Sequence, residues 1–86
     1  MLRVEFFGMA RRRAQVEAVE LRAESLSEVI AELTRLFPSL AASCFRDAQL
    51  APGWTFNIDG QRFTRDPEEV LVAGCCLLLM SSDVGG

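Results

Sequence analysis

The fold is decided by the stretch SLSEVIAELTRLFP, residues 25–38. Its first four residues match a capping box, in which the Ser25 oxygen accepts from first-turn amides and Glu28 reaches back to the cap amide. Apolar residues then recur at three- and four-residue spacing, the pattern of a helix with one buried stripe. The stripe consists of Leu26, Val29, Ile30, Leu33, Leu36 and Phe37. Because proline disfavours helical geometry in the residue before it, the helix is predicted to end before Pro38.

Two strands are predicted ahead of this helix. Leu2, Val4 and Phe6 occupy alternate positions, which is typical of a strand with one buried face, and Gly8 ends the pattern. Residues 16–21 show a less regular alternation. We therefore predict a hairpin whose solvated loop contains Arg11-Arg12-Arg13.

Turn signals dominate the segment after the helix. Residues 39–53 have no sustained period and end in Pro52-Gly53, which predicts a connector with one short helical turn around residues 40–45. Asp59-Gly60 favours a two-residue hairpin turn, because both positions tolerate positive φ, and short strands are predicted on either side at 54–58 and 61–64.

The last predicted strand is CLLLM, residues 76–80, whose unbroken apolar run is typical of a strand covered on both faces in the middle of a sheet. The order of elements predicts an α+β chain in which one main helix packs across a mixed sheet. This is the β-grasp, or ubiquitin-like, arrangement. We expect one domain over residues 1–80 and a flexible C-terminal tail over 81–86.

Composition excludes several classes of function. The 86 residues include nine basic residues, all arginine, and twelve acidic ones, for a net charge of −3. Such an acidic chain offers no general electrostatic attraction for nucleic acid or anionic membranes. Histidine and lysine are absent, which removes the usual proton shuttle, the Schiff-base lysine and the commonest zinc ligand.

The three cysteines, Cys44, Cys75 and Cys76, do not have the spacing of a disulfide framework or a zinc site. A redox pair or sulfur relay at Cys75-Cys76 is one interpretation, and small core fillers are the other and simpler one. The N-terminal segment lacks the apolar run of a signal peptide. We expect a cytoplasmic protein in a reducing compartment, with no metal and no membrane partner.

The residues after the last predicted strand are SSDVGG, residues 81–86. Glycines without side chains make a thread that permits close approach of another backbone, and six extended residues reach roughly 20 Å. The reactive group would be the main-chain carboxylate of Gly86, with Gly85 and Val84 threading into a partner's active site. A carboxylate must first be activated, typically by adenylation. The alternative is an ordinary frayed terminus.

Three segments resemble a known family: VEFFGMAR at 4–11, SLSEV at 25–29, and the closing strand and tail at 73–86. In order and spacing, the chain is similar to the MoaD/ThiS family of ubiquitin-like sulfur carriers, closest to the small subunit of molybdopterin synthase. The family usually has an Asp-Gly-Asp-Glu turn before the closing strand and two prolines before the glycines. Here those places hold Ala73-Gly74-Cys75-Cys76 and Ser81-Ser82-Asp83-Val84.

This resemblance implies a function in molybdenum cofactor biosynthesis. A partner enzyme related to ubiquitin-activating enzymes would use ATP to adenylate Gly86, and a sulfur donor would convert it to a thiocarboxylate. The tail would then deliver sulfur to a pterin precursor inside the large subunit of the synthase. The chain itself would be a non-catalytic subunit with no bound cofactor, and Arg11 and Phe7 would be docking residues.

The sequence is also compatible with other sulfur acceptors and with other roles. Thiamine, cysteine or another sulfur-requiring pathway would use the same carboxyl chemistry. A ubiquitin-like protein modifier or a plain interaction module is a candidate of a different class. Because the sequence has no lysine, such a modifier could not build side-chain isopeptide chains on itself.

Three further groups of residues have a plain and a functional interpretation. The arginines at 11–13 are a solvated loop or a docking site for an acidic partner. Asp66, Glu68 and Glu69 are expected to form a solvated turn rather than a metal site. The aromatic residues Trp54, Phe56 and Phe63 are expected to pack in the second hairpin and core, and any that is exposed is a candidate anchor for a partner.

Overall fold

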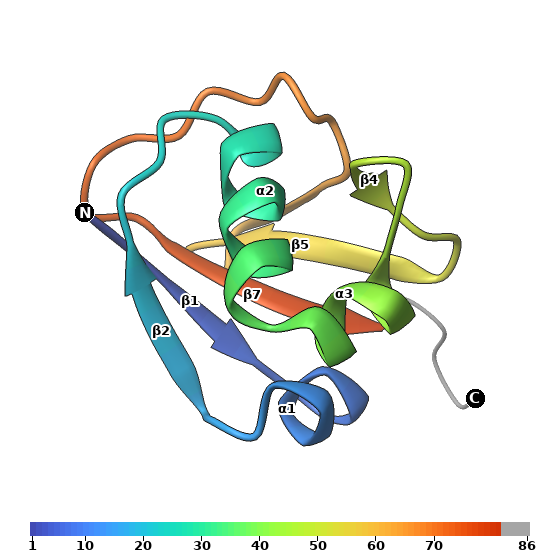
Figure 1. Ribbon diagram of the computed structural model, residues 1–86. Coiled ribbons are helices and arrows are strands. Elements are labelled where there is room, and N and C mark those ends of the chain that lie inside the picture. Colours follow the sequence, from blue (N-terminus) through green and yellow to red (C-terminus); the bar gives the residue numbers. More distant parts are fainter. Residues whose placement is uncertain (82–86) are drawn as a thin grey trace.

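The computed structural model describes residues 1–81, which form a five-stranded mixed sheet in the order β2-β1-β7-β5-β6 (Figure 1). The strands are β1 (Leu2–Phe6), β2 (Ala18–Leu21), β5 (Trp54–Ile58), β6 (Arg62–Thr64) and β7 (Cys76–Ser81). β7 pairs with β1 in parallel and with β5 antiparallel, while β2 and β6 pair antiparallel at the two edges. The prediction that the last strand lies inside the sheet is therefore confirmed.

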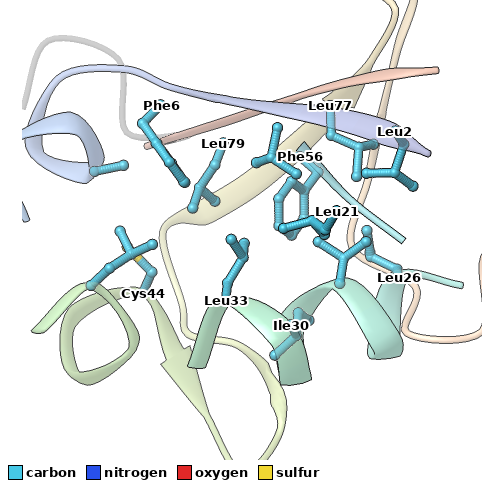
Figure 2. Packing of buried hydrophobic residues seen from close by; sticks show 14 of the residues in the cluster. Leu2, Phe6, Leu21, Leu26, Ile30, Leu33, Cys44, Phe56, Leu77 and Leu79 are labelled. Atoms are coloured by element: carbon cyan, nitrogen blue, oxygen red, sulfur yellow. The ribbon is translucent and has the colours of Figure 1, made fainter. Parts of the chain in front are cut away.

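Three helices contribute to a single core on one face of this sheet (Figure 2). They are α1 (Met9–Ala14), α2 (Leu26–Leu36) and α3 (Pro38–Cys44). The inward residues of the sheet, among them Phe6, Phe56 and Leu79, pack with the buried residues of these helices. Phe6 also makes an edge-to-face contact with Phe37, with ring centroids 5.5 Å apart.

Helix α2 forms where the sequence predicts it. Ser25 is its N-cap and accepts from the Glu28 N–H at 3.3 Å. The Glu28 carboxylate accepts from the N–H of Glu24, one residue before the expected cap amide. Such a cap is worth about 1 kcal/mol, whereas each fully buried aliphatic side chain contributes about 1.5–3 kcal/mol. Four buried α2 residues therefore make packing, rather than capping, the main stabilisation of this helix.

The arginine loop predicted in the first hairpin is wrong, because those residues lie in α1. Gly8 precedes the helix with φ 56° and Gln15 follows it in the left-handed region with φ 64°. The helix faces the core with only Ala10 and Ala14. Two alanines in a six-residue helix do not form a recognisable apolar stripe in the sequence. For this reason the hydrophobic periodicity did not predict the helix.

The predicted connector at 39–53 contains more structure than one helical turn. After α3, the strands β3 (Phe45–Arg46) and β4 (Gln49–Leu50) form a separate two-stranded sheet. Asp47 and Ala48 join them, both with positive φ, at 54° and 63°. Since alanine rarely adopts this conformation, the sequence carried no turn signal here.

The turn between β5 and β6 does lie at Asp59-Gly60, with φ values of 55° and 72°. The prediction of a two-residue turn is wrong, because Ile58 pairs with Arg62 and Gln61 is a third loop residue. Asp59 also ties this turn to the beginning of β7, because its side-chain oxygen accepts from the Cys76 N–H at 2.8 Å. Its own N–H donates to the Cys76 carbonyl at 2.8 Å. Within residues 1–81 no helix is long and apolar enough to cross a membrane.

Arg65 holds the β4–β5 connection in place. Its Nε donates to the carbonyl of Trp54 at 2.9 Å, and its Nη2 donates to those of Leu50 and Ala51 at 3.3 and 3.1 Å. One planar guanidinium thus ties together carbonyls on both sides of the turn at Pro52-Gly53. A lysine ammonium is a point charge and could not match this spread of acceptors.

We predict that Arg65→Met lowers the free energy of unfolding by about 1.5–3 kcal/mol, the usual value of hydrogen bonds from a charged donor. Arg65→Lys should lower the free energy of unfolding by an intermediate amount. Arg22→Met, on another exposed arginine, is the matched control and should change stability by less than about 0.5 kcal/mol. Urea denaturation measures all three, and equal losses for Arg65→Met and Arg22→Met would contradict the role given to Arg65.

Candidate functional site

The candidate site is at the end of β7, where the described part of the chain also ends. Here the Phe7 N–H donates to the Leu79 carbonyl at 3.2 Å, one step beyond the last parallel pair, Phe6 with Leu79. Ser81 closes β7 and its hydroxyl donates to the Gly53 carbonyl at 3.3 Å. The predicted site residues Gly86, Gly85 and Val84 lie outside the described residues.

The structure brings the two predicted docking residues to this end of the sheet. Phe7 has 44% of its surface exposed. Arg11 lies on α1, the helix that begins two residues after Phe7. Both line a small hollow of about 160 Å³, together with Arg3, Glu5 and Glu17. Arg11 makes an ion pair with Glu17, with 2.8 Å between Nη2 and Oε1.

A larger hollow of about 740 Å³ is also lined by that ion pair. It is lined by residues of α1 and of the segment that leads to β2, namely Gly8, Met9, Arg12, Gln15 and Val16, together with Arg11 and Glu17. Met9 and Val16 expose 46% and 42% of their surface. Arg11 and Glu17 line both hollows, so the two hollows share this ion pair.

No family model and no curated protein matches the chain. Solved structures do match. Small archaeal modifier protein 1 from Methanosarcina acetivorans is 21% identical, with a TM-score of 0.84 over 99% of this chain and 95% of that one. A chain of the BexX/CysO complex from Amycolatopsis orientalis is 16% identical, with a TM-score of 0.83 over the whole of both chains.

A protein assigned as subunit 1 of a molybdopterin converting factor from Pyrococcus furiosus is 19% identical, with a TM-score of 0.71 over 93% of this chain and 94% of that one. The chain has the β-grasp fold. The fold predicted from the sequence is thus confirmed, and at these identities the likeness establishes the fold alone.

On this β-grasp sheet the aromatic residues differ in their surroundings. Phe56 is fully buried and Trp54 packs against the core, as predicted. Phe63 has 64% of its surface exposed and lies opposite Asn57, on the face of the sheet away from the helices. On the same face β7 directs Cys76, Leu78 and Met80, which are all half-buried. Phe63 is therefore the aromatic residue of this hairpin that remains exposed.

Cys44 and Cys75 have the surroundings of core fillers, as predicted, whereas Cys76 lies outside the core on the face of the sheet away from the helices. Cys44 and Cys75 are buried, and Cys76 is half-buried. Desolvation raises the pKa of the Cys44 thiol from 9.0 to about 12, partly opposed by Arg13. Desolvation also raises the pKa of Cys75, with a further contribution from Asp59, and that of Cys76, with a contribution from Glu5. All three thiols are thus disfavoured as thiolates, the form that a sulfur relay would need.

We predict that native Cys44 is alkylated by iodoacetamide at pH 8 at least about a thousandfold more slowly than in urea, because a pKa near 12 instead of 9.0 reduces the thiolate fraction by that factor. Peptide mass spectrometry distinguishes Cys44 from the other two thiols. The stabilisation from the protonated thiol is complete below pH 9 and is lost as the pH rises toward 12. Fast labelling of Cys44 in the folded protein would contradict this burial.

The acidic segment before β7 is a structured turn. The Asp66 side chain accepts from the Glu68 N–H at 2.9 Å. Glu69 accepts from both Nη atoms of Arg62 and from the Thr64 hydroxyl, and these bonds lower its pKa. Within residues 1–81 no three acidic or cysteine side chains gather into a group that could hold a metal ion.

Sequence reasoning missed the surface around Arg11. Met9, Val16 and Glu17 were not singled out, because a surface contact leaves no periodic pattern and α1 itself was not predicted. The usable signal was the pair of apolar residues, Met9 and Val16, on either side of three arginines in an otherwise acidic chain.

Proposed function

We propose that this protein is a sulfur carrier whose Gly86 carboxylate is adenylated by a partner enzyme with ATP and then converted to a thiocarboxylate. The observation that carries the proposal is the position of β7. It is the central strand, hydrogen-bonded on both sides, and it ends at Ser81, five residues before Gly86 in the sequence. A rigid scaffold of this kind fixes the point from which a reactive terminus extends.

The chemistry of the side chains also supports a main-chain reactive group. The sequence has no histidine and no lysine, and burial keeps the cysteine thiols protonated. A carrier needs none of these groups, because the partner enzyme supplies activation and the sulfur donor supplies the nucleophile. The chain would then act as a non-catalytic subunit without a cofactor of its own, in the cytoplasm.

For the acceptor we propose a pterin precursor, with the chain as the small subunit of molybdopterin synthase. The name of the similar Pyrococcus furiosus protein and the segment at 4–11 favour this pathway. The large subunit would receive the tail, with Gly85 and Val84 in its channel and Phe7 and Arg11 at its entrance. Thiamine and cysteine pathways use the same carboxyl chemistry, and genes beside this one would distinguish them.

We predict that co-expression with its adenylating enzyme and a sulfur donor increases the mass of the protein by about 16 Da, the difference between sulfur and oxygen in a thiocarboxylate. Gly86→Val should abolish this gain, because a displacement of about 1 Å at a reacting carbon can cost ~100-fold in rate. Gly85→Ala should slow it. The melting temperature should be unchanged in both variants, since both positions follow the last strand.

Cys75→Ala is the matched control for the tail variants. This buried side chain should cost about 1 kcal/mol of stability or more when truncated, while thiocarboxylate formation continues. A Cys75→Ala variant that keeps its stability but loses sulfur transfer, together with a Gly86→Val variant that still transfers sulfur, would rule out the C-terminal carboxylate as the carrier.

A protein modifier is the second candidate, favoured by the name of the similar Methanosarcina acetivorans protein. In that role Gly86 would be joined to amines of target proteins. Immunoblots would then show covalent ladders that disappear when Gly85 and Gly86 are deleted. A carrier alone gives the mass gain without ladders.

A further inference from the structure

The α1 face is a local basic and apolar surface on an acidic protein. We use this name for Phe7, Met9, Arg11, Arg12 and Val16. The sequence of α1 is MARRRA, with three arginines and no acidic residue, whereas the whole chain has a net charge of −3. Phe7, Met9 and Val16 each expose more than 40% of their surface. Exposed apolar side chains beside clustered arginines are typical of a protein-binding surface.

The position of the α1 face connects it to the proposed tail. β1 leads into α1, and Phe7 is hydrogen-bonded to Leu79 near the end of β7 (Figure 1). The end of β7 thus lies at the end of the sheet at which α1 begins, and a protein that binds there can contact the α1 face. The partner of the α1 face rests on the proposed function, because it is the enzyme that activates Gly86.

The ion pair between Arg11 and Glu17 occupies the centre of this surface. The Arg11 side chain is 56% exposed and the Glu17 side chain 75% exposed, and both residues line the hollow at Phe7 as well as the hollow at Met9 and Val16. Exposed ion pairs contribute little to stability, so this pair can open at small cost. Opening it would free the Arg11 guanidinium, which lines both hollows, to bind another carboxylate.

We infer that the α1 face binds a segment of the activating enzyme that carries a carboxylate next to an apolar side chain, and that this carboxylate replaces Glu17 on Arg11. Arg12, on the wall of the larger hollow, provides a second positive charge for the same segment. The apolar side chain fits between Met9 and Val16. Glu17 is then an internal competitor that holds Arg11 in the unbound protein.

This role for Glu17 predicts an effect opposite in sign to the one expected if Glu17 merely held Arg11 in a binding conformation. Removing the competitor should strengthen binding of the enzyme, because Arg11 no longer has to break its ion pair with Glu17 first. Removing a positioning residue should weaken it. Glu17→Gln keeps the shape of the side chain and removes only its charge, so this variant separates the two roles.

The test is ATP–pyrophosphate exchange by the adenylating enzyme of this protein, measured as the concentration of the carrier is varied. We expect Glu17→Gln to lower the KM for the carrier about twofold to fivefold with kcat unchanged. Arg12→Glu should raise this KM about tenfold or more. Both effects should shrink at high salt, since the α1 face is exposed to solvent.

Glu20→Gln is the matched control, because Glu20 is an exposed glutamate on β2 that lies opposite Arg3 rather than on the α1 face. It makes the same change of charge and should leave the KM unchanged. Melting temperatures verify that all variants are folded. An unchanged or raised KM for Glu17→Gln, with normal exchange by the wild type, overturns the inference and leaves the proposed function intact. A wild-type protein that supports no exchange overturns both.

Discussion

The parallel pairing of β1 with β7 is the interaction on which the rest of this structure depends. It places the last strand beside the first and fixes the register from Arg3 with Cys76 to Phe6 with Leu79. The inward residues Leu77 and Leu79 of β7 then close the core against the helices. The same pairing determines which surface lies at the end of β7, since the residues that follow β1 are those of the α1 face.

Much of this fold could be predicted because its decisive signals are local. The cap at Ser25, the break at Pro38 and the turn at Asp59-Gly60 each act through neighbouring backbone groups. The missed elements lack such signals. Helix α1 is anchored by two alanines, and the β3–β4 turn has Ala48 in a conformation that favours glycine. Tertiary packing holds both of these elements where propensity alone did not predict them.

Some residues of the candidate site could likewise be predicted from the sequence, and others could not. Arg11 and Phe7 could be predicted because one segment resembles a known family. The structure places both residues around one hollow. Glu17 could not be found in that way, because its role depends on its ion pair with Arg11, a contact between α1 and the segment that leads to β2. Charge composition would not reveal it either, since the net charge of the chain hides the local positive surface of α1.

The parallel arrangement also has a mechanical consequence. Met1 lies next to the beginning of β1, and Ser81 closes β7 at the opposite end of the sheet. A pull between these two points slides the central strands along each other and loads all the hydrogen bonds of the β1–β7 ladder together. Strands pulled apart from one end would lose those bonds one at a time. A force applied at the end of β7 is therefore resisted by the whole β1–β7 ladder at once.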